Sequence, residues 1–334
     1  MNIAVGVGVW VAEILILAAT SARPFGAWMG VVFASILLPL PVFVSAPPLV
    51  RCLLACFLGA TLVRALDLAA RSPMAGFLQR LAHLCAYFDT RQVQRRSPRW
   101  DWSALRSAFA AAGMLALCIA VVKRTPAEGS WLPLRWLAGG VGLLALAEAA
   151  GACHQILTLA LGVHVPPLFC APYLSKSVAE FWSRRWNVAG SEALRHYFFA
   201  PFARHPVVGL FATFAASAAG HMLIAGIAMR NRPLAVACGA FFLIQPFLIM
   251  IERHIGVRRW RPAGRIMWTA AALGISSPLV VEPILRIAER AWGEPNEVAH
   301  PTAAAVGFCA TIGLFAALAG RACMSREFSE SYEP

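Results

Sequence analysis

His221 is the residue in this sequence whose type and position most directly suggest chemistry. It lies inside the apolar run 206–229, about fifteen residues after the basic segment that precedes the run. At 1.5 Å per residue, a helix places it about 22 Å along the run. Ionisable groups so deep in an apolar span usually face a bundle interior or a water-filled cavity, and neutral imidazole accepts a proton near pH 7. The sequence therefore predicts a functional role for His221, and a packing histidine is the alternative.

The segment 163–205, which precedes this run, is aromatic and basic rather than uniformly apolar. Long connections of this kind are usually functional or disordered, and this one is too rich in Phe, Trp and Tyr to be disordered. Ser177, followed three residues later by a glutamate, has the spacing of a capping box. A helix is therefore expected from Val178, with Trp182 and Trp186 on one face.

A second short helix is expected in the same segment. Gly190 and Ser191 are predicted to end the first helix, and Ser191 to cap a second one over 193–199. Two such amphipathic helices would lie along the cytoplasmic membrane surface, with aromatic side chains toward lipid and guanidinium groups toward phosphates. An interfacial anchor without chemistry is the alternative interpretation.

The stretch APYLSKSVAEFWSRRWN, followed by LRHYFFAPF and a span with an isolated histidine, resembles the wax synthase branch of the membrane-bound O-acyltransferases. That branch carries a P-x-L-x-x-S-x-x-x-F-W-x-R-R-W-N-like motif upstream of an intramembrane histidine. The motif maps onto Ser177, Phe181, Trp182, Arg184, Arg185, Trp186, Asn187, Leu194, Arg195 and Pro201. The motif-level resemblance covers about 167–225. Ser183 stands where the branch usually has glycine, and Met222 where plant members tend to have glutamate.

The resemblance implies transfer of an acyl group from acyl-CoA to a hydroxyl, with His221 as the catalytic base. Acyl-CoA would be a co-substrate, and no cofactor and no metal are implied. Asn187 would hydrogen-bond the thioester carbonyl or hold the substrates in register. The implied substrate-binding residues are Trp182, Trp186, Arg184, Arg185 and Arg195. A solvated basic loop is the other interpretation of the three arginines.

Other catalytic arrangements lack their sequence signals. No G-x-S-x-G elbow is present, and the nine cysteines form no CxxC pair. Most of these cysteines lie in apolar runs, where cysteine behaves as a small hydrophobic residue. We therefore expect direct transfer in a ternary complex, without an acyl-enzyme, a zinc site or a disulfide framework.

The elements that must hold these residues are membrane helices. The 334 residues are 59% hydrophobic and 13% charged, with a mean hydropathy of +0.66, whereas soluble domains carry about 25% charged residues. The net charge of +13 resides in loops between apolar runs. This distribution orients a membrane protein and argues against nucleic-acid binding.

The predicted fold is an all-α polytopic bundle of eight or nine spans, with one membrane-embedded domain over 1–334 and the cytoplasmic insertion 163–205. A first span, rather than a signal peptide, is expected at the N-terminus. The spans are expected near 3–20, 26–45, 48–69, 104–122, 133–156, 206–229, 233–251, 264–285 and 302–320. Pro39 and Pro41 interrupt the second span, and Pro278 and Pro283 predict a kink in the eighth.

The arginines predict the orientation. Arginine collects in the segments 70–102, 157–205 and 252–263, which nine spans place on one side of the membrane. The positive-inside rule makes that side cytoplasmic, with the N-terminus outside. Arg321 and Arg326 fall on the same side. We expect a multi-pass integral membrane protein, of the inner membrane in a bacterium or of the endoplasmic reticulum in a eukaryote.

Several other ionisable residues lie in predicted spans and leave alternatives open. Arg64 and Asp67 are expected to pair along a helix face. His154 is a rival base. A proton-coupled transporter is the second function class, because Glu13 and Glu282 also lie in spans, but no internal repeat supports it. The expected acceptor is a lipophilic hydroxyl compound. An apolar tunnel does not distinguish a long-chain alcohol from a sterol, so both remain candidates. A different hydroxyl acceptor and any oligomeric state also stay open.

Overall fold

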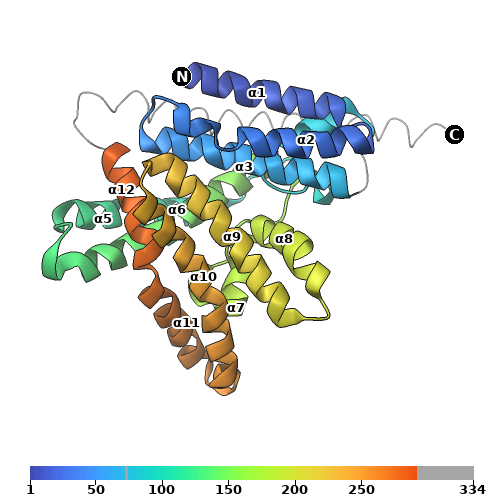
Figure 1. Ribbon diagram of the computed structural model, residues 1–334. Helices are drawn as coiled ribbons and strands as arrows, with labels where there is room; N and C mark the ends of the chain where they lie inside the picture. The colour runs from blue at the N-terminus through green and yellow to red at the C-terminus, as the bar shows by residue number, and fades with distance from the viewer. Residues whose placement is uncertain (72–73, 96, 292–334) are drawn as a thin grey trace.

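The protein is a bundle of α-helices (Figure 1). The computed structural model describes residues 1–71, 74–95 and 97–291. The α-helices are α1 (Ile3–Thr20), α2 (Pro24–Leu37), α3 (Pro48–Ala70), α4 (Phe77–Cys85), α5 (Trp102–Arg124), α6 (Leu132–Ala160), α7 (Val178–Glu180), α8 (Val188–Leu194), α9 (Pro206–Met229), α10 (Arg232–His254), α11 (Pro262–Ser276) and α12 (Pro278–Ala291). The short 3-10 and π turns are η1 (Leu40–Phe43), η2 (Thr90–Gln92), η3 (Gly129–Trp131), η4 (Pro172–Leu174), η5 (Phe181–Arg185), η6 (Arg195–Phe199), η7 (Ala200–Phe202) and η8 (Val257–Arg259). One two-residue antiparallel ladder joins β1 (Gln94–Arg95) to β2 (Val163–His164).

The predicted spans are confirmed as far as the structure describes the chain. Seven helices are long and apolar enough to cross a membrane, and the bent pair α11–α12 makes an eighth. The second span is interrupted as predicted, because α2 ends at Leu37 and η1 follows it. The predicted span 302–320, with the arginines beyond it, lies outside the described residues.

The kink predicted in the eighth span is a full break. The axes of α11 and α12 differ by 59°. Pro278 begins α12 and has no backbone N–H to continue the α11 ladder. The Ser277 hydroxyl instead donates to the Gly274 carbonyl at 2.8 Å. The break turns one span into two short helices that present different faces to the bundle interior.

Helix α9, which carries His221, is fastened to α3 at its C-terminal end. The guanidinium of Arg51, buried on α3, donates to the carbonyls of Ile227 and Ala228, in the last turn of α9, at 2.5–3.2 Å. The last carbonyls of a helix have no intrahelical partner, and a cation also complements the negative end of the helix dipole. Arg51 therefore fixes this end of α9 against the first part of the chain, which Figure 1 shows as α1, α2 and α3 lying side by side.

The segment before α9 is fastened to α3 as well. The Tyr197 hydroxyl, on η6, donates to the Asp67 carboxylate. Asp67 is buried and pairs with Arg64 at 2.5 Å, which confirms the predicted helix-face pair. Helix α3 therefore contacts both the C-terminal end of α9 and the segment that leads into its N-terminal end.

The motif segment forms two helical stretches as predicted, α7 with η5 and α8 with η6, and the first begins at Val178 behind the Ser177 cap. The first stretch packs into the bundle instead of lying along its surface. Val178 and Phe181 are buried, and Val178 packs with Phe214 of α9, Ile249 of α10 and Ala272 of α11. The prediction for the second helix was wrong at its start, because Gly190 lies inside α8 rather than before it. Asn187, in the left-handed backbone region at φ 44°, begins that helix.

Candidate functional site

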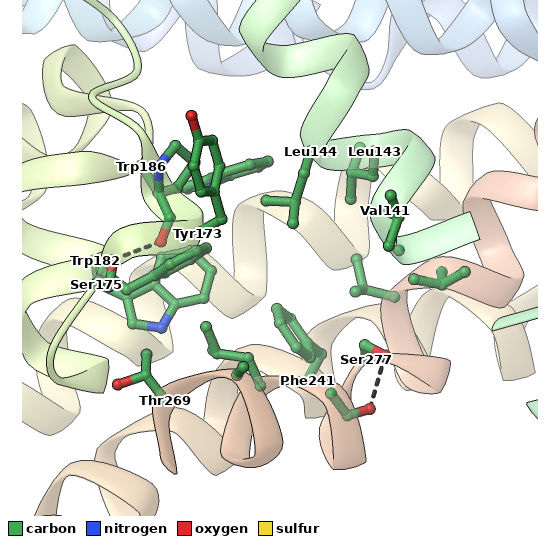
Figure 2. A pocket seen from close by; sticks show the side chains of 18 of the residues that line it. Val141, Leu143, Leu144, Tyr173, Ser175, Trp182, Trp186, Phe241, Thr269 and Ser277 are labelled. Atoms are coloured by element: carbon green, nitrogen blue, oxygen red, sulfur yellow. Dashed lines mark hydrogen bonds between the residues drawn. The ribbon is translucent and has the colours of Figure 1, made fainter. Parts of the chain in front are cut away.

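A mainly apolar cavity of about 430 Å³ lies between α6, α10, α11, α12 and the motif segment. Figure 2 shows Leu143 and Leu144 of α6 facing Phe241 and Ser277 across it, with Trp182 on a third side. His221 reaches the same cavity from α9. A concave, largely apolar site with a few polar groups is the usual form of a small-molecule pocket. The histidine predicted from its depth in a span therefore faces a cavity of ligand size.

The geometry of His221 fixes which ring nitrogen is free. Its Nδ1 lies 2.8 Å from the backbone carbonyl oxygen of Ser217, one turn earlier on α9. A carbonyl oxygen only accepts hydrogen bonds, so Nδ1 carries the proton of the neutral ring and Nε2 keeps its lone pair. The ring also stacks on Phe242, with centroids 3.9 Å apart and an interplanar angle of 27°. Both contacts hold the imidazole in one orientation with a basic nitrogen available.

Trp182 of the motif contacts several aromatic side chains near His221. Its indole N–H donates to the Gln245 side-chain oxygen at 3.1 Å. Its ring makes edge contacts with Phe214 at 5.9 Å and Phe241 at 6.0 Å, and a tilted one with Phe242 at 5.5 Å. Since Phe242 also stacks on His221, Trp182 and His221 share a packing partner.

The motif presents these aromatic rings through a π-helical turn. In η5 the Trp186 N–H donates to the Phe181 carbonyl at 2.9 Å, an i to i+5 bond. The Phe181 and Trp186 rings consequently stack, with centroids 5.5 Å apart and planes 13° apart. A π turn is rare and frequently marks a functional site. It brings Phe181, Trp182 and Trp186 together at the apolar cavity, where ordinary α-helical spacing predicted only the two tryptophans on one face.

A second cavity, of about 540 Å³, lies on the other side of Trp182. Arg184 and Arg195 of the motif segment and Arg253 at the end of α10 line it. The three guanidinium groups are exposed and form no ion pair with any carboxylate in the described part of the chain. Glu192 also lines this cavity, where it accepts a hydrogen bond from Gln92 at 2.6 Å. The predicted positions of Arg184 and Arg195 thus converge on a basic cavity, which Arg253 joins.

One face of α9 connects the two cavities. Leu210, Thr213, Phe214 and Ser217 line the basic cavity at helical spacing, and His221 follows one turn later at the apolar one. The rise from Ser217 to His221 is about 6 Å. A molecule with its charged end in the basic cavity therefore has a short path along α9 to the histidine.

Arg185 does not reach either cavity. Its side chain pairs with Glu180 at 2.6 Å and donates to the carbonyl of Cys170 at 3.0 Å. Burial raises the pKa of Glu180, but the hydrogen bonds from Arg185 and the Lys176 backbone N–H, together with the charges of these two residues, outweigh it and leave that pKa below its ordinary value. Arg185 therefore braces the η4 region against α7, and its predicted place in the substrate-binding group is not supported by this geometry.

Asn187 has a defined orientation but lines neither cavity. Its side-chain oxygen accepts the Gly190 N–H at 3.0 Å and the Tyr87 hydroxyl at 2.9 Å. Because a backbone N–H only donates, it identifies this atom as the oxygen, which leaves the amide NH2 as the free end. That NH2 has no hydrogen-bond partner among the described residues. Asn187 thus caps α8 while keeping a donor available.

Three residues of the site region were missed at the sequence level. Gln245 is completely buried in α10, and Glu252, buried near the end of that helix, accepts the Val178 N–H at 2.6 Å. These two side chains dock the motif segment onto α10. A polar residue in an apolar span was the available signal for Gln245. Arg253 was visible only as one of several arginines in a basic loop.

The rival ionisable residues lie elsewhere. His154 contacts Phe88 edge-on at 5.5 Å and does not line the apolar cavity. Glu282 accepts the Trp136 indole N–H at 3.0 Å and pairs with Arg286 at 2.7 Å. Glu13 is buried in α1, and its carboxylate oxygens have no partner among the described residues. No cluster of three or more potential metal ligands occurs in the described part of the chain.

Known proteins share this segment. The sequence model of the membrane bound O-acyl transferase family matches residues 165–244, which contain the motif, α9 and most of α10. The probable long-chain-alcohol O-fatty-acyltransferase 7 of Arabidopsis thaliana is 31% identical over 146 residues, 39% of this chain and 43% of that protein. The probable long-chain-alcohol O-fatty-acyltransferase 2 of the same plant is 35% identical over 121 residues, 33% of this chain and 35% of that protein.

The matches thus cover less than half of these relatives' length. Within the family match lie the π turn, both tryptophans, Arg184, Arg195 and His221, whereas Arg253 lies outside it. The resemblance of this chain to the wax synthase-like branch of the membrane-bound O-acyltransferases is therefore confirmed.

Proposed function

We propose that this protein transfers a fatty acyl group from acyl-CoA to the hydroxyl of a long-chain alcohol, forming an ester and free CoA. The observation that carries the proposal is the free Nε2 of His221 in an apolar cavity, with Nδ1–H held by the Ser217 carbonyl. The names of the plant relatives favour a long-chain alcohol as acceptor. A sterol is the second candidate, because the cavity is large and apolar enough for either class.

His221 acts as the general base in this reaction. The alcohol O–H donates to Nε2, and as the proton moves to the imidazole the alcohol oxygen attacks the thioester carbonyl. The tetrahedral intermediate then expels the CoA thiolate, which takes the proton back from the imidazolium as free thiol. Asn187 lines neither cavity here, so in this proposal its amide N–H meets the developing oxyanion only in the substrate-bound complex, a role worth about 2.7–4 kcal/mol for such a donor.

The donor binds with its charged end in the basic cavity. Acyl-CoA carries phosphates, which guanidinium groups recognise by paired hydrogen bonds. Arg184, Arg195 and Arg253 have no competing carboxylate partner in the described residues, so they are available for such contacts. The pantetheine arm then follows the α9 face to His221. The arginine distribution places this entrance on the cytoplasmic side.

Ester synthesis by the purified protein tests the proposal. The full chain in detergent or liposomes receives palmitoyl-CoA with 1-hexadecanol or cholesterol in parallel. We expect a wax ester from the alcohol, and loss of about 10²- to 10⁴-fold in turnover on His221→Ala, the range for a positioned general base. His205→Ala is the matched control, since His205 is exposed and makes no side-chain cap at the start of α9. Wild-type turnover in a folded His221→Ala protein would exclude this base.

A further inference from the structure

Two helical glycines line the apolar cavity at positions where the structure has room for a side chain. A Cβ added at Gly274 of α11 meets no atom within 4 Å, and one added at Gly140 of α6 meets Val281 at 3.8 Å, an ordinary contact. Neither has a positive φ. Gly139 differs, because its Cβ would lie 2.5 Å from Val281, so that glycine permits α6 to approach α12 closely. Packing and backbone geometry thus account for Gly139 but not for the other two.

Glycine weakens a helix interior relative to alanine. What the missing side chains of Gly140 and Gly274 provide is space, and the space belongs to the cavity that His221 faces. The two positions lie on different helices, so the cavity is widened from two walls. A role in determining what fits the cavity accounts for both.

The chemistry of the walls indicates what occupies this space. The hydroxyls of Ser175, Thr269 and Ser277 line the cavity, but each donates to a backbone carbonyl nearby, at 2.6, 3.0 and 2.8 Å. The indole N–H groups of Trp136 and Trp182 are likewise directed to Glu282 and Gln245. These five groups have no donor left for a ligand, so the part of the ligand that they surround is hydrocarbon. The Tyr173 hydroxyl and the Trp186 indole N–H also line the cavity and form no hydrogen bond among the described residues, so they are the donors open to a polar group.

The shape of the lining favours a long chain. On α11 the cavity is lined by Ile266, Thr269, Ala270, Leu273 and Gly274, which follow one face of the helix. The rise from Ile266 to Gly274 is about 12 Å. The charged donor has its own entrance among the arginines on the other side of Trp182. The acceptor therefore does not share the entrance of the CoA group. The donor's acyl chain is the competing occupant of the apolar cavity, and the preference among acyl-CoA donors distinguishes the two.

Resting on the proposed function, we infer that the apolar cavity holds the unbranched alkyl chain of the acceptor alcohol, and that Gly274 and Gly140 determine which chain lengths are accepted. Filling the cavity from either position removes room for methylene groups. Each methylene gained or lost in an apolar pocket changes discrimination by about 10- to 200-fold.

Gly274→Leu tests the inference through a ratio. The measurement is kcat/KM for 1-hexadecanol divided by kcat/KM for 1-decanol, with palmitoyl-CoA as donor. We expect the ratio to fall at least about tenfold relative to the wild type. The preference between palmitoyl-CoA and decanoyl-CoA should not change. Gly113→Leu is the matched control, because Gly113 is an exposed helical glycine whose added Cβ also meets nothing, and it lies outside the cavity.

Binding gives a second measurement that does not depend on turnover. In the wild type 1-hexadecanol should raise the Tm more than 1-decanol, and Gly274→Leu should abolish that difference. If the wild type makes no ester from either alcohol but shows this pattern, the inference stands while the proposed function fails. An unchanged alcohol ratio in Gly274→Leu, or a change in acyl-CoA preference instead, overturns the inference. We expect Gly140→Leu to lower the same alcohol ratio as Gly274→Leu does. It replaces Gly274→Leu in the test if that variant does not fold.

Discussion

The hydrogen bond between Trp182 and Gln245 offers a direct test of how the motif is docked beside His221. The indole N–H reaches a side-chain oxygen that is completely buried in α10. Gln245 in turn donates to the Phe241 carbonyl at 2.9 Å and the Ser276 hydroxyl at 3.3 Å. Gln245→Met preserves the length of the side chain while removing both polar groups.

The magnitude follows from the orphaned donor. Leaving a buried N–H without a partner costs about 1–3 kcal/mol. Trp182→Phe removes that donor and has its own cost from the lost contacts of the indole ring. In the double variant the orphan no longer exists, so its destabilisation should be less than the sum of the singles by about 1 kcal/mol, inside the 0.5–3 kcal/mol range of contacting residues.

Reversible unfolding in mixed micelles measures the four free energies of the cycle. Gln155→Met is the matched control, because Gln155 is another membrane-helix glutamine, bonded to Asp101 at 3.0 Å and away from the apolar cavity. Combined with Trp182→Phe it should be additive to within about 0.3–0.5 kcal/mol. The same additivity in the Gln245 cycle would refute the claim that this bond docks the motif.

Three further predictions concern charge, donation and pH. Arg253→Glu should raise the KM for palmitoyl-CoA about tenfold or more at low salt and less at high salt, while the KM for 1-hexadecanol stays near the wild-type value. The control Arg261→Glu should leave both KM values near wild type, and equal effects of the two variants would remove Arg253 from the donor site. Asn187→Asp keeps the oxygen that caps α8 but loses the N–H donor, so we expect about a 10²-fold loss of turnover with an unchanged Tm. Full turnover in this variant would show that Asn187 serves only as the cap of α8. Burial lowers the pKa of His83 below its ordinary value despite the Asp67 carboxylate, which lies 3.6 Å from Nε2. The unfolded chain therefore binds the proton more readily, and stability should fall as the pH drops below about 6.5. His83→Gln should flatten the plot of Tm against pH, whereas the control His205→Gln should not. An unchanged slope in His83→Gln would show that His83 does not cause the loss of stability.

Hydropathy was enough to predict the described spans, and the depth of His221 in one of them was enough to predict that it faces a cavity, because both depend on the sequence along one helix. The break at Pro278 was predictable for the same local reason. The π turn was not, because nothing in the sequence FWSRR distinguishes an i to i+5 bond from an i to i+4 bond. It is seen only with the stacking of Phe181 on Trp186 and the packing of Trp182 against α10.

The arginines of the motif show most clearly what the sequence alone does not predict about the site. Arg184 and Arg185 are adjacent and chemically identical, yet one lines the basic cavity and the other is held by Glu180. Composition and the positive-inside rule assign both to the same loop and cannot rank them. Arg253 joins the cavity from a helix about sixty residues later, a juxtaposition that depends on how α10 packs against the motif. Local patterns thus predicted the elements, and tertiary packing selected the members of the site.

The polar groups of the cavity also bear on why the proposed base would activate an alcohol and not water. A buried water needs two to four hydrogen-bond partners to be stable. Ser175, Thr269 and Ser277 direct their protons to backbone carbonyls, so this part of the wall offers water few partners, and the open donors are those of Tyr173 and Trp186. An alkyl chain that fills the cavity displaces the remaining water and brings its own hydroxyl as the group that meets Nε2 of His221. Hydrolysis of the thioester is then disfavoured by the same apolar surface that binds the acceptor, and the selectivity between alcohol and water requires no additional catalytic residue.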